Sequence, residues 1–212
     1  MDTSPDTTPS SPAQRAGRSA PPHAAAAPGD CPDPVESTGE QPDVLRLRDI
    51  AFDDAAALLA RYGLSLQRVP DGEAIPGSFW GESEAGLIGT TVYVRSDTPV
   101  HSLLHEAGHL IVLPPGRRAE VHTDATDSVE EEDAVCVLQV LLADALAGVG
   151  RDRLLADMDA WGYSFRLGSA RAYFERDAAD AWRWLQAHAL VDARDALALP
   201  VPPAAMAGTA PA

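Results

Sequence analysis

Residues 101–112 read HSLLHEAGHLIV, and this segment constrains the fold more than any other part of the chain. Three histidines stand four residues apart, and almost every position between them is apolar or small. Because positions four apart share one face of a helix, the segment predicts a helix that carries His101, His105 and His109 in one column. The apolar remainder predicts that this helix is mostly buried, with its few polar groups clustered.

His105 and His109 bracket Glu106 in the pattern H-E-x-x-H. Two imidazoles on adjacent turns can bind one Zn²⁺, and the glutamate can then accept a proton from a water molecule that the metal activates. The alternative is a half-exposed helix with ordinary histidines. In that case a buried Glu106 would need another partner, because an unpaired buried charge is costly. His101 is either a neighbour of the ligands, a substrate contact or, as we favour, a surface histidine at the helix N-terminus.

A third protein ligand is needed to complete such a zinc site. After a polar loop, residues 128–146 read SVEEEDAVCVLQVLLADAL and predict a helix that opens with three glutamates. The apolar positions below Glu131 on its own face favour Glu131 as the ligand that points inward, with Glu130 and Glu132 as alternatives. Ser128 and Glu131 also form a capping-box pattern, so helix capping is the competing interpretation of Glu131.

His122, in the loop before that helix, is the rival third ligand. Its spacing from His109 is too long for the compact H-E-x-x-H-x-x-G-x-x-H arrangement. Candidate donors to a transition-state oxyanion are His122, Tyr93 and Tyr163. Three further residues are predicted to have structural roles. Asp124 and Asp127 are expected to be turn and cap residues, and Cys136 is expected to be a core residue.

The order of predicted elements is a helix and a small sheet followed by helices, which is typical of an α+β fold. Before residue 98 the patterns predict a helix over 49–62, a strand over 64–69 and extended segments over 78–81 and 87–95. The histidine helix should begin at Thr98-Pro99, with the threonine hydroxyl as its cap, and end at Pro114-Pro115. Further helices are predicted near 128–147, 151–160 and 168–190. The aromatic residues between 161 and 184 are interpreted as core rather than as the lining of a cleft.

Composition separates a folded domain from two tails. Nine of the 18 prolines fall in residues 1–42, which lack an apolar run and are predicted to be disordered, as is an Ala/Pro-rich tail over 196–212. The domain is predicted over 43–195. A net charge of −16 disfavours nucleic acid as a partner. The chain shows neither an export signal nor an 18-residue apolar run, and its two cysteines have unlike contexts; we therefore expect no membrane span and a cytoplasmic protein.

The HEAGH helix, followed after a loop by E-x-x-A from Glu131 to Ala134, resembles the zincin metallopeptidases, and among them the small glutamate-zincins of the ImmA/IrrE type. The resemblance covers roughly residues 87–147. It implies a zincin-like fold, with a small sheet packed on the H-E-x-x-H helix and a mostly helical C-terminal half. It implies Zn²⁺ bound by His105, His109 and Glu131, with Glu106 as the base.

The resemblance also implies that the segment Thr90–Arg95 is an edge strand that aligns an extended peptide through main-chain hydrogen bonds. The expected function is therefore a zinc-dependent metallopeptidase that acts on a peptide or protein substrate. One alternative is a non-catalytic zinc-binding regulatory or interaction protein on the same fold, with a closed site completed by His122 or His101. A second alternative is a metal-free interaction domain whose Pro-rich tail binds partners.

Overall fold

The computed structural model describes residues 42–200 except 80, 82, 124, 126, 127 and 199. Nearly all of the predicted N-terminal tail, with Cys31, lies outside the described residues, as does most of the C-terminal tail. Asp124 and Asp127 lie outside them as well. At the other end of the domain, the Ala198 amide donates to the Leu190 carbonyl at 2.9 Å, three residues beyond the expected boundary.

The described residues form an α+β structure with a small mixed sheet. Its elements are η1 (Leu47–Asp49), α1 (Phe52–Ala60), β1 (Ser65–Arg68), β2 (Gly86–Ile88), β3 (Thr91–Val94), α2 (Val100–Val112), α3 (Pro115–Arg118), α4 (Val129–Asp144), α5 (Arg151–Trp161), α6 (Ala170–Arg176) and α7 (Ala179–Ala187). The α+β class and the helical second half are thus confirmed.

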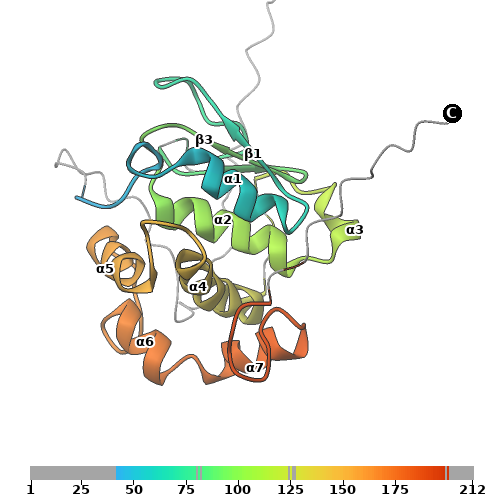
Figure 1. The fold of residues 1–212 in the computed structure, drawn as a ribbon, viewed down its shortest axis with the longest axis vertical. Helices are drawn as coiled ribbons and strands as arrows, with labels where there is room; N and C mark the ends of the chain where they lie inside the picture. Colours follow the sequence, from blue (N-terminus) through green and yellow to red (C-terminus); the bar gives the residue numbers. More distant parts are fainter. Residues whose placement is uncertain are drawn as a thin grey trace, which may run out of the picture.

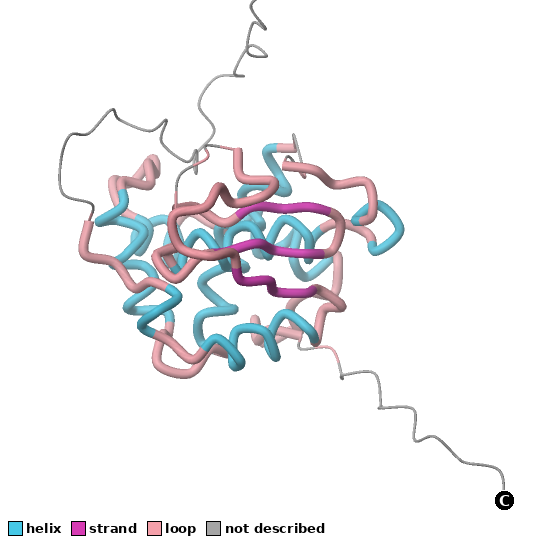
Figure 2. Tube along the Cα trace, turned by 90° about the horizontal axis from the view of Figure 1, so that it is seen from above, coloured by secondary structure: helices cyan, strands magenta, loops and turns pink. Residues whose placement is uncertain are grey.

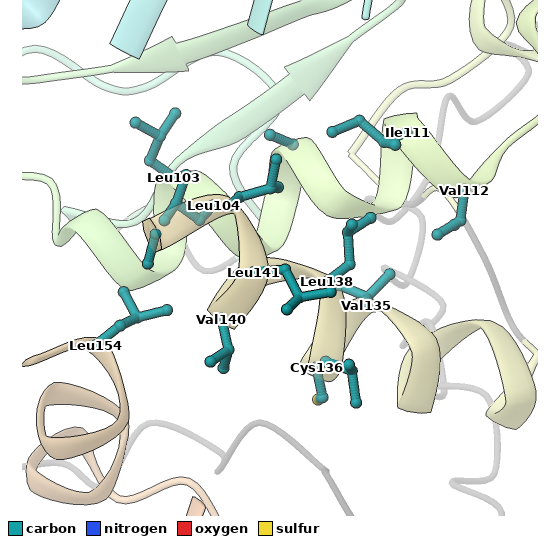
Figure 3. Packing of buried hydrophobic residues seen from close by; sticks show 14 of the residues in the cluster. Leu103, Leu104, Ile111, Val112, Val135, Cys136, Leu138, Val140, Leu141 and Leu154 are labelled. Atoms are coloured by element: carbon teal, nitrogen blue, oxygen red, sulfur yellow. The ribbon is translucent and has the colours of Figure 1, made fainter. Parts of the chain in front are cut away.

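Helix α2 lies in the middle of the molecule. The sheet and α1 lie on one side of it and α4 on the other; α5 lies beside α4 and also contacts α2, and α6 and α7 lie beyond α4 (Figure 1). Every residue of α2 is buried except Glu106 and His109. Figure 3 shows Leu138 and Leu141 of α4 packed beneath α2. An apolar helix of this kind is stable because neighbours cover it on both sides, as its composition predicted.

The sheet places the predicted edge strand at its centre. Its order is β1-β3-β2, with β1 parallel and β2 antiparallel to β3, and the three strands lie side by side in Figure 2. The prediction of an edge strand over Thr90–Arg95 is therefore wrong, because both edges of β3 are already paired. The reason is a hairpin turn inside the predicted segment 87–95. Gly89, at φ +60°, turns the chain between β2 and β3.

Three further expectations differ in detail. The hydroxyl of Thr98 accepts from the Arg95 amide at 2.9 Å instead of capping α2, and Pro99 is the N-cap residue. Of the described residues of 78–81, Phe79 and Gly81 lie in bends, and none belongs to a strand. The predicted helix over 168–190 is divided into α6 and α7.

A buried arginine completes the C-terminal end of α2. The guanidinium of Arg118 donates to the carbonyl oxygens of Ile111 (3.3 Å), Leu113 (3.2 Å) and Tyr62 (2.7 Å). The last carbonyls of a helix have no partner within the helix, so a buried helix end needs such a donor.

Replacing Arg118 with methionine is expected to destabilise the protein by about 2–4 kcal/mol, because the aliphatic volume is kept while buried carbonyls lose a charged donor. Urea unfolding would measure the difference. Arg117→Met is the matched control, since Arg117 is exposed on the same short helix and should change stability little. Equal losses in the two variants would contradict this assignment.

Candidate metal centre

The partly exposed surface of α2 consists of Glu106 and His109, which lie three residues apart on one face of the helix. His105, one turn before His109, is buried. The carboxylate of Glu132, in the first turn of α4, reaches both imidazoles. Its Oε1 lies 3.4 Å from Nε2 of His105, and its Oε2 lies 3.4 Å from Nε2 of His109. Among the described residues, these three side chains form the one group of histidine, cysteine and acidic ligands close enough to hold a metal ion.

The ligand atoms of the three residues lie close enough to share one metal ion, all within 4.8 Å of one another. The two Nε2 atoms lie 3.2 Å apart, and each lies 3.4 Å from a carboxylate oxygen. Ligands bound tetrahedrally to Zn²⁺ at about 2.0–2.1 Å would lie about 3.3 Å from one another. A charge-assisted hydrogen bond is shorter, at about 2.7–2.9 Å. The two 3.4 Å distances, each to a different oxygen of Glu132, are therefore longer than ion-paired hydrogen bonds and nearer to the spacing of ligands around one zinc ion.

The protonation states of the imidazoles agree with this interpretation. Burial lowers the pKa of His105 and of His109 to about 4, so both rings are neutral at pH 7. Their contacts with Glu132 are then not ion pairs, although the atoms are close enough. Neutral imidazoles and a carboxylate are the forms that bind a metal ion, and together they carry one negative charge for a cation to neutralise.

The group of three ligands is buried at one end and open at the other. The exposed fraction of the side chain rises from 6% for His105 to 12% for His109 and 26% for Glu132. Glu106, the remaining partly exposed residue of α2, lies on the same side as His109. Glu132 and Glu106 are thus both partly exposed. Such an opening is typical of catalytic zinc sites, whereas structural sites are closed by a fourth protein ligand.

Glu132, not Glu131, meets the two histidines. Glu131 is partly buried in the first turn of α4, where its amide donates to the Ser128 hydroxyl at 3.4 Å, as the capping pattern predicted. The apolar face could not separate the two glutamates, because α4 has no single apolar face: all residues from Ala134 to Ala143 are buried. Gln139, on the same helical face as Glu132, is the sequence signal that could have identified the ligand, since it marks a polar stripe.

His101 is buried rather than on the surface. It is 1% exposed, its ring packs against Trp161 at 4.9 Å between centroids, and its Nδ1 lies 3.4 Å from the Tyr163 hydroxyl. Burial, with His105 and Arg46 nearby, lowers its pKa to about 3. The interpretation of His101 as a surface residue is therefore wrong. The neutral ring lies one turn before His105 and helps to enclose the buried end of the ligand group.

Of the other candidates of the sequence analysis, His122 and Glu130 do not belong to the ligand group, and Tyr163 lies beside one of its members. His122 is exposed, with its Nδ1 3.0 Å from the Thr123 hydroxyl, and Glu130 is exposed at the start of α4. Tyr93 is half-buried on β3. Tyr163 is buried with its ring 6.2 Å from that of His105. Cys136 is a buried core residue, as expected.

The aromatic residues that follow α5 also belong largely to the core. Tyr163 stacks on Phe165, which stacks on Tyr173, and all three are buried. This stack links the ring beside His105 to α6.

Comparisons with known proteins leave the site to be interpreted from its own chemistry. No family model matches the chain, and neither a curated protein nor a solved structure matches it significantly. Within the described part of the chain, none of the helices combines the length and the apolar character that a membrane span requires.

Proposed function

We propose that this chain is a zinc-dependent metallopeptidase in which His105, His109 and Glu132 bind the metal and Glu106 is the general base. The observation that carries the proposal is the ligand group itself: two neutral imidazoles and a partly exposed carboxylate whose ligand atoms lie within 4.8 Å of one another. Glu132 replaces Glu131 in the ligand set expected from the sequence. The finer architecture, a zincin-like domain, belongs to the same proposal.

Bound zinc would supply a Lewis acid that polarises the scissile carbonyl and acidifies a water molecule. The chain's own residues account for the rest. His105 and His109 hold their Nε2 atoms toward Glu132 and are kept unprotonated by burial. Glu106 lies next to His105 in sequence and on the open side of the helix. From there it accepts the proton of the attacking water and delivers it to the leaving amine.

The sheet supports a peptide as the substrate class. The amide of Ala85, which directly precedes β2, donates to the Ser102 hydroxyl at 3.0 Å. Ser102 lies one turn before Glu106 on α2, so β2 is tied to the helix face that carries the base. An extended peptide that adds to the edge of β2 would therefore lie beside Glu106 and the ligands. The alignment of an extended peptide, which the sequence analysis assigned to β3, is therefore assigned to β2, the antiparallel neighbour of β3.

The experiment that tests the function combines metal content with hydrolysis. Protein purified without chelator is expected to contain one equivalent of zinc by elemental analysis and to cleave members of a quenched fluorescent peptide library. Removal of zinc with 1,10-phenanthroline should abolish cleavage, and added zinc should restore it. His105→Ala should lose both metal and cleavage, whereas the exposed His188→Ala should keep both.

Two outcomes would count against the proposal. Metal-free protein that does not take up added zinc would contradict the metal site. Bound zinc without hydrolysis of any peptide would favour the alternative of a non-catalytic zinc-binding interaction protein.

A further inference from the structure

The outer edge of β2 is occupied by a segment of the same chain. We call this segment, Val121–Thr123, the strap. The Gly89 amide donates to the Val121 carbonyl at 2.8 Å, and the Thr123 amide donates to the Leu87 carbonyl at 3.0 Å. His122 forms an antiparallel bridge with Ile88. The strap therefore pairs with β2 as an additional strand would.

Pairing with the strap and with one neighbouring loop uses the main-chain groups that β2 turns away from β3. The Leu87 amide donates to the Gly77 carbonyl at 3.1 Å, while the Leu87 carbonyl and the Gly89 amide bind the strap. A peptide could add to this edge only by replacing one of these partners. Of the two partners, the strap should be the easier one to displace, because it lies in the loop between α3 and α4 and contributes a single short bridge.

Thr123 holds the strap in an unfavourable backbone conformation. Its φ is +71°, in the left-handed region, which a β-branched residue rarely adopts. The chain then continues to Ser128, the N-cap of α4, four residues before Glu132. Strain of this kind lowers the free-energy difference between the paired strap and a released one, since release lets Thr123 return to an ordinary φ.

We propose that the strap is an autoinhibitory element: Val121–Thr123 occupies the place of an extended peptide on β2, beside Glu106 and the metal ligands, and must leave before a substrate binds. This inference rests on the proposed function, because it takes the β2 edge as the substrate site. The competing peptide is recognised through its main chain, so it needs an extended conformation rather than one particular sequence.

Two substitutions at one position should shift the equilibrium between the paired and the released strap in opposite directions. Thr123→Pro removes the amide that binds Leu87 and fixes φ near −65°, so it should release the strap. Thr123→Asn keeps the amide and tolerates positive φ, so it should hold the strap more firmly. Both are made in a Glu106→Gln background, in which a bound peptide is not cleaved. The probe is a fluorescent peptide with the sequence of residues 118–125, whose binding is followed by anisotropy.

Compared with the Glu106→Gln parent, Thr123→Pro should bind the probe at least about tenfold more tightly, because a larger fraction of the molecules has an open edge. Thr123→Asn should bind it more weakly. Hydrogen exchange at the Gly89 amide should be faster in Thr123→Pro and slower in Thr123→Asn, with zinc content unchanged. If Thr123→Pro fails to retain zinc, the probe affinity of Thr123→Asn compared with that of the parent still tests the strap proposal.

Equal affinity for the probe in the parent and the zinc-loaded variants would overturn the strap proposal. Faster exchange at Gly89 without tighter binding would overturn it too, since the edge would then be open but not a peptide site. Tighter binding in Thr123→Pro, together with no cleavage of the probe when Glu106 is intact, would support the strap while contradicting the peptidase.

Discussion

Replacing Glu106 with glutamine is expected to lower kcat/KM for peptide hydrolysis by about 10²- to 10⁴-fold while one equivalent of zinc is retained. Glu106 is not among the three grouped ligands, so its loss should not empty the site. Glutamine keeps the shape and the hydrogen-bonding reach of the side chain but cannot accept the proton of the attacking water. The expected result is therefore a loss of rate with little change in metal affinity or stability.

Glu175→Gln serves as the control, because Glu175 is an exposed glutamate on α6. It should match the wild-type protein in rate and in zinc content. A Glu106→Gln variant that hydrolyses peptides at the wild-type rate would exclude Glu106 as the base. Loss of zinc from Glu106→Gln would instead identify Glu106 as part of the metal-binding group.

Glu132→Gln is expected to weaken zinc binding by at least about a hundredfold, whereas Glu131→Gln should bind zinc normally. Substitutions of groups that merely orient metal ligands cost about 10- to 100-fold in affinity, so loss of a ligand should cost no less. The carboxylate of Glu132 lies 3.4 Å from both Nε2 atoms and is the one anionic member of the group. A neutral amide in its place removes the charge that attracts the cation.

Competition with a chromogenic zinc chelator would measure the two affinities on folded protein. The pair is well matched, since both residues lie in the first turn of α4 and both changes remove one negative charge. A general electrostatic effect would weaken both variants equally. Zinc loss in Glu131→Gln with retention in Glu132→Gln would restore the ligand assignment made from the sequence.

Local sequence determined which residues share a face of a helix and where helices begin and end. The column of His105 and His109 follows from their spacing, since residues four apart share a face in any α-helix. Ser128 begins α4 because its hydroxyl can accept a free amide of the first turn. Gly63, at φ +74°, ends the helical region of α1, as expected. Each of these features involves residues within about one turn of each other.

Tertiary structure decided which residues meet. Successive residues on a helix point about 100° apart, so Glu131 and Glu132 present different faces, and only the packing of α4 on α2 selects one of them. A helix that is buried on all sides has no single apolar stripe, so its sequence pattern cannot indicate which of the two glutamates faces α2. His101 is enclosed because Trp161 and Tyr163 fold back from a distant part of the chain.

The sheet shows the same division. Alternation identified β1 and the extended character of 87–95, but strand order depends on pairing between segments about 25 residues apart. β3 lies at the centre of the sheet for two reasons. The hairpin at Gly89 pairs one of its edges with β2, and β1 pairs in parallel with the other. The sequence by itself determined the histidine pair and its helix. The packing of α4 decided the third candidate ligand, and pairing between distant segments decided which strands lie at the edges of the sheet.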